Sequence, residues 1–142
     1  MLNEPVLVDT GPLIALYNPN DPHHADCVAA VQTLPVGKAY TCWPVIVEAA
    51  HLLRKYPRER ERLFRSLAAD EFVLLPLSAS DLPGIQGVID KYHDQSVDLA
   101  DAAIVHLADR EEIGVVFTLD RRHFHVFWRR SGAPFALLPE LT

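Results

Sequence analysis

Short apolar runs that alternate with longer helical segments constrain this chain more than any other feature. The first run, Val6-Leu7-Val8, ends in Asp9 and is followed by a small-residue turn and a second apolar segment. Runs of this length, separated by helices, are typical of buried parallel strands joined by crossover connections. Strands are expected at residues 5–9, 39–41, 72–75, 115–119 and 135–138. The predicted fold is therefore α/β, a three-layer α/β/α sandwich with a mainly parallel central sheet.

Helix signals fill the intervals between the predicted strands. Asp21 and Pro22 suit the N-cap and first position of a helix that would reach about Leu34 and bury Cys27, Val28, Val31 and Leu34. Pro57 limits the helix that begins at Pro44. Helices are expected at residues 11–17, 21–34, 44–55, 58–69, 80–92, 98–111 and 121–129.

Length and composition indicate one domain of ordinary globular type. The chain has 142 residues, and we interpret residues 1–142 as a single domain. No apolar stretch approaches the roughly 20 residues that cross a bilayer, and the N-terminus lacks the pattern of a secretory signal. Cys27 and Cys42 form neither a CxxC pair nor a disulfide framework. We therefore expect a cytoplasmic protein with reduced cysteines and no membrane partner.

Four acidic residues interrupt or end apolar segments. Asp9 and Asp120 each close a predicted strand, whereas Glu48 and Asp101 lie within apolar helical segments. An ionised side chain in such a place is costly unless it is paired or binds a metal. The carboxyl edge of an open α/β sheet is also where ligands collect. A divalent-metal site built from Asp9, Glu48, Asp101 and Asp120 is the leading hypothesis.

Asp98 is a fifth candidate ligand, and the least certain. It lies three residues before Asp101, so the two share a helix face at its first turn. Asp98 or Ser96 is equally suited to cap this helix. The pattern therefore leaves open which of the two aspartates faces a metal.

Clustered carboxylates are suited to phosphodiester chemistry. Mg²⁺ prefers oxygen ligands, polarises a phosphoryl oxygen and lowers the pKa of a bound water. Without a cation, four neighbouring carboxylates repel one another and take up protons. The cluster therefore implies a divalent-cation cofactor such as Mg²⁺, with one or two ions left open.

The net charge of −6 argues against adhesion to nucleic acid through bulk charge, but it does not exclude a nucleic-acid substrate. Basic residues form two clusters. For the first we favour a solvated helix with local ion pairs over an RNA-binding patch, and for the second we weigh the two equally. The first cluster comprises Arg54, Lys55, Arg58, Arg60, Arg62 and Arg65; the second comprises Arg121, Arg122, Arg129 and Arg130.

The order and contexts of the acids resemble the PIN-domain family, and within it the VapC-type toxins of bacterial type II toxin–antitoxin systems. The resemblance is carried by Val8-Asp9-Thr10, the segment around Glu48, residues 98–102 and Phe117-Thr118-Leu119-Asp120. It implies a magnesium- or manganese-dependent endoribonuclease, a hydrolase that cleaves RNA phosphodiester bonds. It also implies inhibition by a small antitoxin protein and a homodimeric toxin.

Family resemblance also suggests a role for each acid. Asp9 and Asp101 would be direct metal ligands, Glu48 would be a ligand or would orient a water, and Asp120 would act partly through water. Thr10 and Thr118 match small hydroxyl positions that could brace these carboxylates.

Three alternative functions are consistent with parts of the sequence. A haloacid-dehalogenase-like phosphatase needs an aspartate two residues after the first, and position 11 is Gly. The serious alternatives are a non-catalytic PIN-like module that binds RNA or protein, and a housekeeping RNA-processing nuclease. Among the histidines, His51 is interpreted as a packed or surface residue, and His123 and His125 as possible RNA contacts.

Overall fold

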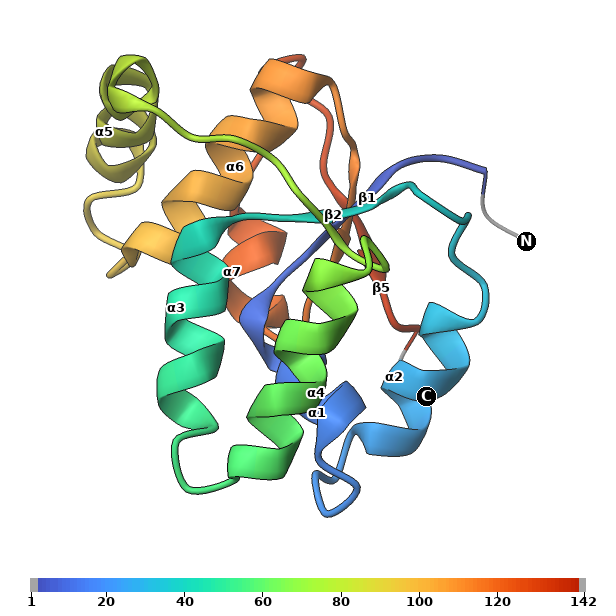
Figure 1. Cartoon of the computed structure of the whole chain (residues 1–142). Coiled ribbons are helices and arrows are strands. Elements are labelled where there is room, and N and C mark those ends of the chain that lie inside the picture. The colour runs from blue at the N-terminus through green and yellow to red at the C-terminus, as the bar shows by residue number, and fades with distance from the viewer. Residues whose placement is uncertain (1–2, 141–142) are drawn as a thin grey trace.

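The computed structural model describes residues 3–140 and contains one five-stranded sheet (Figure 1). The strand order is β3-β2-β1-β4-β5, and every neighbouring pair is parallel. All five predicted strands are present, each at or inside its expected range, and the prediction of a mainly parallel sheet is confirmed. Their bounds are β1 Val6–Val8, β2 Ala39–Thr41, β3 Val73–Leu74, β4 Val115–Phe117 and β5 Ala136–Leu138.

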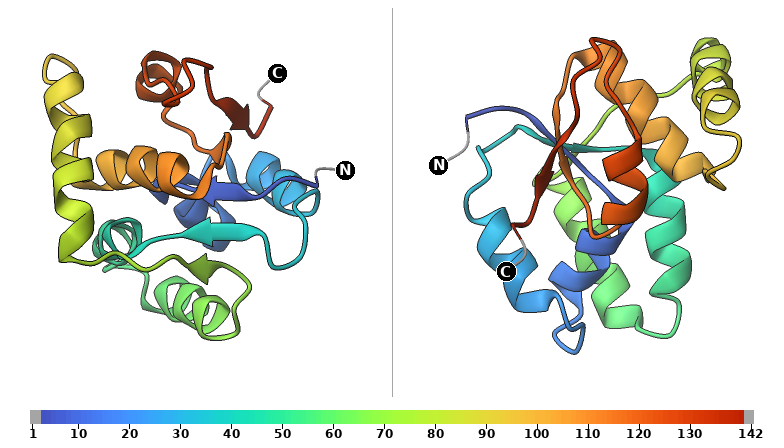
Figure 2. Two further views of the ribbon diagram at one scale, coloured as in Figure 1. Left: turned by 90° about the horizontal axis from the view of Figure 1, so that it is seen from above. Right: turned by 180° about the vertical axis from the view of Figure 1, so that it is seen from behind.

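Helices cover both faces of the sheet, as the views in Figure 2 show. Because crossovers between parallel strands are right-handed, the helices that connect β1 to β2 and β2 to β3 share one face, and those that lead to β4 and β5 share the other. The predicted three-layer α/β/α sandwich is thus the observed one. The helices are α1 Thr10–Tyr17, α2 His24–Val31, α3 Trp43–Leu52, α4 Pro57–Ala68, α5 Leu82–Lys91, α6 Leu99–Glu111 and α7 Arg121–Val126, and a 3₁₀ turn at Ala79–Asp81 precedes α5.

Four predicted helix boundaries are each wrong by three residues: the helices expected to end at residues 34 and 55 end at Val31 and Leu52, and two further boundaries also differ. The helix expected from residue 21 begins at His24, because Asp21 forms a turn in which its side chain accepts from the His23 amide and its carbonyl from the His24 amide. Of the residues expected to be buried there, Cys27 is buried and the others are half-buried. The helix expected to reach residue 129 ends at Val126, since Phe127 adopts an extended backbone.

The central strands position the candidate site. Val6, Leu7 and Val8 of β1 have no exposed surface, as expected for a strand covered on both faces. After β1, the chain adds β2 and β3 toward one edge of the sheet, and then adds β4 and β5 toward the other edge. The direction in which strands are added therefore reverses between β1 and β4. Ligands of doubly wound folds bind outside the carboxyl ends of strands at such a reversal. Asp9 and Asp120 follow β1 and β4.

Among residues 3–140, none of the helices combines the length and the apolar character needed to cross a bilayer.

Candidate active site

Asp9 lies at the junction of β1 and α1 and is held by its neighbour β4. Its amide donates to the Phe117 carbonyl at 2.9 Å, which continues the β1–β4 pairing. The Thr118 hydroxyl donates to Asp9 Oδ2 at 2.8 Å, and Thr118 is fully buried. Only 6% of Asp9 is exposed. The carboxylate is therefore fixed between the two central strands.

The structure distinguishes the roles of the two aspartates of α6. Asp98 is exposed and occupies the N-cap, where its Oδ1 accepts from the Asp101 amide at 2.8 Å. Asp101, in the first turn, is buried with 5% exposure. Asp101 is thus the aspartate of this pair that turns toward the other acids, and Asp98 stabilises the helix end that presents it.

Glu48 reaches the same region from α3. It is half-buried, and the Thr10 hydroxyl donates to its Oε2 at 3.3 Å. Both threonines that the sequence suggested as braces therefore contact a carboxylate, Thr10 on Glu48 and Thr118 on Asp9.

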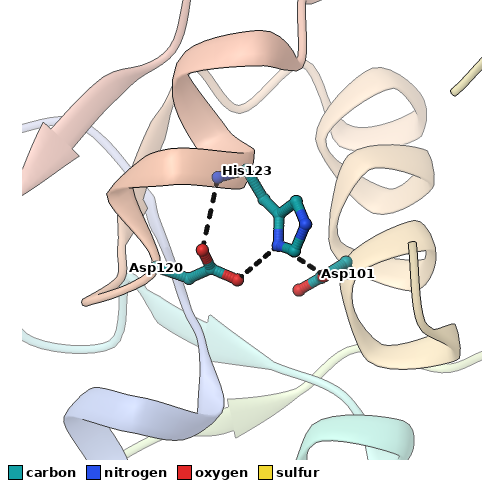
Figure 3. A group of neighbouring side chains, drawn as sticks. All are labelled: Asp101, Asp120 and His123. Atoms are coloured by element: carbon teal, nitrogen blue, oxygen red, sulfur yellow. Dashed lines mark hydrogen bonds and ion pairs between the residues drawn. The ribbon is translucent and has the colours of Figure 1, made fainter. Parts of the chain in front are cut away.

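Asp120 begins α7 and is paired with His123 one turn later (Figure 3). Its Oδ1 accepts from the His123 amide at 3.2 Å, and its Oδ2 lies 2.8 Å from His123 Nδ1. The same Nδ1 is 3.8 Å from Asp101 Oδ2. Donor atoms of Asp101, Asp120 and His123 all lie within 4.8 Å of one another, the spacing of a possible metal centre.

Burial, and to a smaller extent mutual repulsion, raises the pKa values of three of the acids. Burial raises the pKa of Asp9 to about 6, with smaller contributions from Glu48 and Asp120. Burial, together with Asp9, Asp98 and Asp120, raises the pKa of Asp101 to about 8. Burial and the charges of Asp98 and Asp120 also raise the pKa of Glu48. The hydrogen bond to Asp120 raises the pKa of His123. This region therefore favours positive charge.

A divalent cation fits this donor set. Carboxylate oxygens are hard ligands of the kind that Mg²⁺ and Mn²⁺ take, and the raised pKa values show that the acids lack enough positive charge of their own. Asp9, Glu48, Asp101 and Asp120, which come from four separate segments, are all brought into this one region.

The sequence pattern does not predict that His123 lies among the acids. The sequence suggests only an RNA contact for His123, but its Nδ1 faces two carboxylates. Its spacing of three residues from Asp120, at the start of a helix that follows a strand, was the available signal. His125, on the same helix, is exposed, and His51 is exposed on α3.

The basic residues of the two clusters do not form two continuous surface patches. In the first, Arg65 pairs with Glu61 at 2.7 Å and Arg62 lies over the Tyr17 ring, as expected of a solvated helix. The second is divided: Arg121 and Arg122 adjoin Asp120, whereas Arg129 and Arg130 line a pocket with Asp109 and Glu112 near the opposite end of α6 from Asp101.

Comparison with known proteins agrees with this arrangement. The profile of the PIN domain matches residues 6–127, a span that contains all five acidic candidates. The chain belongs to the PIN-domain family. Among curated proteins it is similar to ribonuclease VapC26 of Mycobacterium tuberculosis, with 30% identity over 139 residues that cover 94% of this chain and 100% of the relative.

Solved structures of PIN-like toxins share its fold. M. tuberculosis VapC20, described as a toxin that cleaves the sarcin–ricin loop, superposes with a TM-score of 0.71 at 17% identity, covering 78% of this chain and 86% of VapC20. A toxin–antitoxin complex from Klebsiella pneumoniae superposes with a TM-score of 0.66 at 20% identity, covering 84% and 89%. The PIN-like α/β fold expected from the sequence is thus confirmed.

An apolar groove adjoins the acids. It has a volume of about 630 Å³. Trp43, Val47 and Leu99 on its wall are each more than half exposed, and Glu48 and Asp98 line it as well. The groove therefore joins an apolar surface to an acidic one.

Proposed function

We propose that this PIN-domain protein is a metal-dependent endoribonuclease and the toxin of a type II toxin–antitoxin pair. The observation that carries the proposal is the meeting of Asp9, Glu48, Asp101 and Asp120 at the reversal point of the sheet, in a chain 30% identical to ribonuclease VapC26. A non-catalytic module has no physical reason to keep four mutually repelling acids in one place.

In the proposed mechanism these four acids would hold Mg²⁺ or Mn²⁺, with Asp9 and Asp101 as direct ligands. When bound, the cation supplies Lewis-acid polarisation of the scissile phosphate and a more acidic water. Thr118 orients Asp9, and Thr10 orients Glu48, so that each carboxylate keeps its position without a cation. Asp98 caps α6 and thereby fixes Asp101.

The acids also set the protonation of the site. Burial and the neighbouring carboxylates raise the pKa of Asp101 to about 8, so the metal-free chain favours the protonated form of this group near neutral pH. A bound cation would favour the carboxylate, and its binding would therefore release this proton. The substrate we propose is RNA, and the site of action is the cytoplasm, in keeping with the free cysteines Cys27 and Cys42.

The apolar groove beside the acids supports an antitoxin partner. A segment that places an apolar side chain against Trp43, Val47 and Leu99 and a basic side chain near Glu48 and Asp98 would match both parts of the groove. A second apolar hollow of about 400 Å³, between Trp43, Phe64 and Leu74, favours the homodimer that the family resemblance suggests. Light scattering of the purified chain would test this dimer.

The decisive experiment is the incubation of total RNA with the purified protein in Mg²⁺, Mn²⁺ or EDTA. Asp101→Asn is run alongside, with Asp90→Asn as a control that makes the same chemical change on the exposed surface of α5. We expect discrete fragments with either metal for the wild type and the control, and none in EDTA or for Asp101→Asn. Cleavage that is equal for Asp101→Asn would refute the proposed site, and absence of cleavage by any folded, antitoxin-free protein would refute the proposed activity.

A further inference from the structure

The imidazole of His123 is held by contacts on both of its nitrogens. Nδ1 faces Asp120 Oδ2 at 2.8 Å and Asp101 Oδ2 at 3.8 Å (Figure 3). Nε2 lies 2.9 Å from the Gln95 carbonyl, in the loop before α6. The ring is also nearly parallel to Phe127, with centroids 6.0 Å apart. Its orientation is therefore fixed by the chain and not by solvent.

The Gln95 carbonyl determines which nitrogen keeps its proton when the ring is neutral. A carbonyl oxygen can only accept, so Nε2 donates to it. In the metal-free chain Nδ1 also donates, to the Asp120 carboxylate; when this second proton leaves, the lone pair is on Nδ1, the atom that faces the two carboxylates. A histidine that ligates a metal commonly donates its other N–H to a carbonyl or carboxylate in this way.

We propose that His123 Nδ1 is itself a metal ligand, beside Asp101 and Asp120, and that this nitrogen makes the site prefer first-row transition metals, with Mn²⁺ as the probe, to Mg²⁺. The inference rests on the proposed metal-dependent function and adds a ligand to it. Imidazole is a good ligand of transition metals, whereas Mg²⁺ prefers oxygen.

The donor spacings match this assignment. Ligands at roughly 2.1 Å from one octahedral ion are about 3 Å apart when adjacent and about 4 Å apart when opposite. The two distances from Nδ1 to the carboxylate oxygens, 2.8 Å and 3.8 Å, lie close to these values. One ion could thus contact His123, Asp101 and Asp120 with little movement of any of them.

The alternative is that His123 only braces Asp120. Both assignments predict that a substitution weakens metal binding, since the loss of a supporting hydrogen bond typically costs about 10–100-fold in metal affinity. They differ in whether nitrogen is bonded to the ion. The test must therefore detect the bond and not only the affinity.

The experiment is pulsed electron paramagnetic resonance of Mn²⁺ bound to the full chain, prepared with unlabelled and with ¹⁵N-labelled histidine. We expect a nitrogen coupling that changes with the label in the wild type. The coupling should disappear in His123→Asn and persist in His125→Asn, the matched control on the same helix, and in His51→Asn. We also expect Mg²⁺ to displace Mn²⁺ at least tenfold more readily from His123→Asn than from the wild type.

Each other outcome overturns the inference. Bound Mn²⁺ without a histidine coupling makes His123 a brace, and a coupling lost in His51→Asn instead assigns the nitrogen to α3. Cleavage of RNA in Mg²⁺ by a chain that does not bind Mn²⁺ refutes the preference but leaves the nuclease intact. If the folded chain neither cleaves RNA nor binds metal, both proposals are refuted. If His123→Asn misfolds, a wild-type spectrum without a histidine coupling still refutes the inference, and loss of the coupling in His51→Asn or His125→Asn refutes it as well.

Discussion

Replacing Asp9 by Asn should stabilise the metal-free protein, although it removes a proposed metal ligand. Burial raises the Asp9 pKa from 3.8 to about 6, against the hydrogen bonds from the Thr10 backbone and Thr118. A difference of about two pKa units between the folded and unfolded states corresponds to about 3 kcal/mol. Asn has nearly the same shape, still accepts from Thr118, and carries no charge to desolvate.

The pH dependence of this effect has a defined sign. The folded protein binds the Asp9 proton more tightly than the unfolded chain does, so this group contributes its full stability below pH 3.8 and loses it as the pH rises through about 6. The advantage of Asp9→Asn should therefore be close to zero near pH 4, roughly half developed at pH 5 and about 3 kcal/mol at pH 8.

Urea unfolding in EDTA, followed by circular dichroism at pH 5 and pH 8, measures this difference. Asp90→Asn, on the exposed end of α5, controls for the change in net charge and should stay within about 0.5 kcal/mol of the wild type at both pH values. If Asp9→Asn is neutral or destabilising at pH 8 in EDTA, desolvation does not dominate at Asp9, and the reasoning is wrong.

Three further results are expected from the same structure. Gly84→Ala should destabilise the protein by about 1–3 kcal/mol in thermal melts because a Cβ at this position overlaps the His106 ring, whereas Gly87→Ala, with open space around it, should stabilise α5 by about 0.5–1 kcal/mol. Thr118→Val should weaken Mn²⁺ binding in calorimetry by about 10–100-fold because Asp9 loses its hydroxyl donor, and unchanged affinity would contradict this role. Saturating Mg²⁺ at pH 8 should raise the melting temperature of the wild type but not of Asp9→Asn; equal shifts would place the ion elsewhere.

The fold could be predicted because its sheet is fully covered. Each strand of a doubly covered sheet is a short, continuous apolar run, and Val6–Val8 and Val115–Phe117 are such runs. Helix ends were harder to predict, because hydrogen bonds that form a turn compete there with those that cap a helix. Asp21 followed by Pro22 is a typical helix start, but the Asp21 side chain forms a turn with the His23 amide. The helix therefore begins only at His24.

The sequence could predict those site residues whose location depends only on the strand that precedes them. Asp9 and Asp120 follow parallel neighbours, so a common sheet edge is unavoidable. The choice between Asp98 and Asp101 depended on which residue caps α6. Asp98 does so by accepting from the Asp101 amide, but in the sequence Ser96 is an equally suitable cap. The position of the His123 ring depends on a loop distant in the sequence, in which the Gln95 carbonyl accepts from the ring. Tertiary contacts of this kind leave no periodic trace in a sequence.

Helix ends also bear on why a cation is needed. Asp9, Asp98 and Asp120 are the N-caps of α1, α6 and α7, so three positive helix ends meet the acids. Each helix end stabilises a nearby anion by about 0.3–1 kcal/mol, or roughly 1–3 kcal/mol for all three. Asp9 alone carries a penalty of about 3 kcal/mol above its pKa, and the pKa of Asp101 is raised further still. The helix dipoles therefore cannot neutralise the acids, and a bound cation would supply the missing charge while leaving the carboxylates unprotonated, as the proposed cleavage of RNA requires.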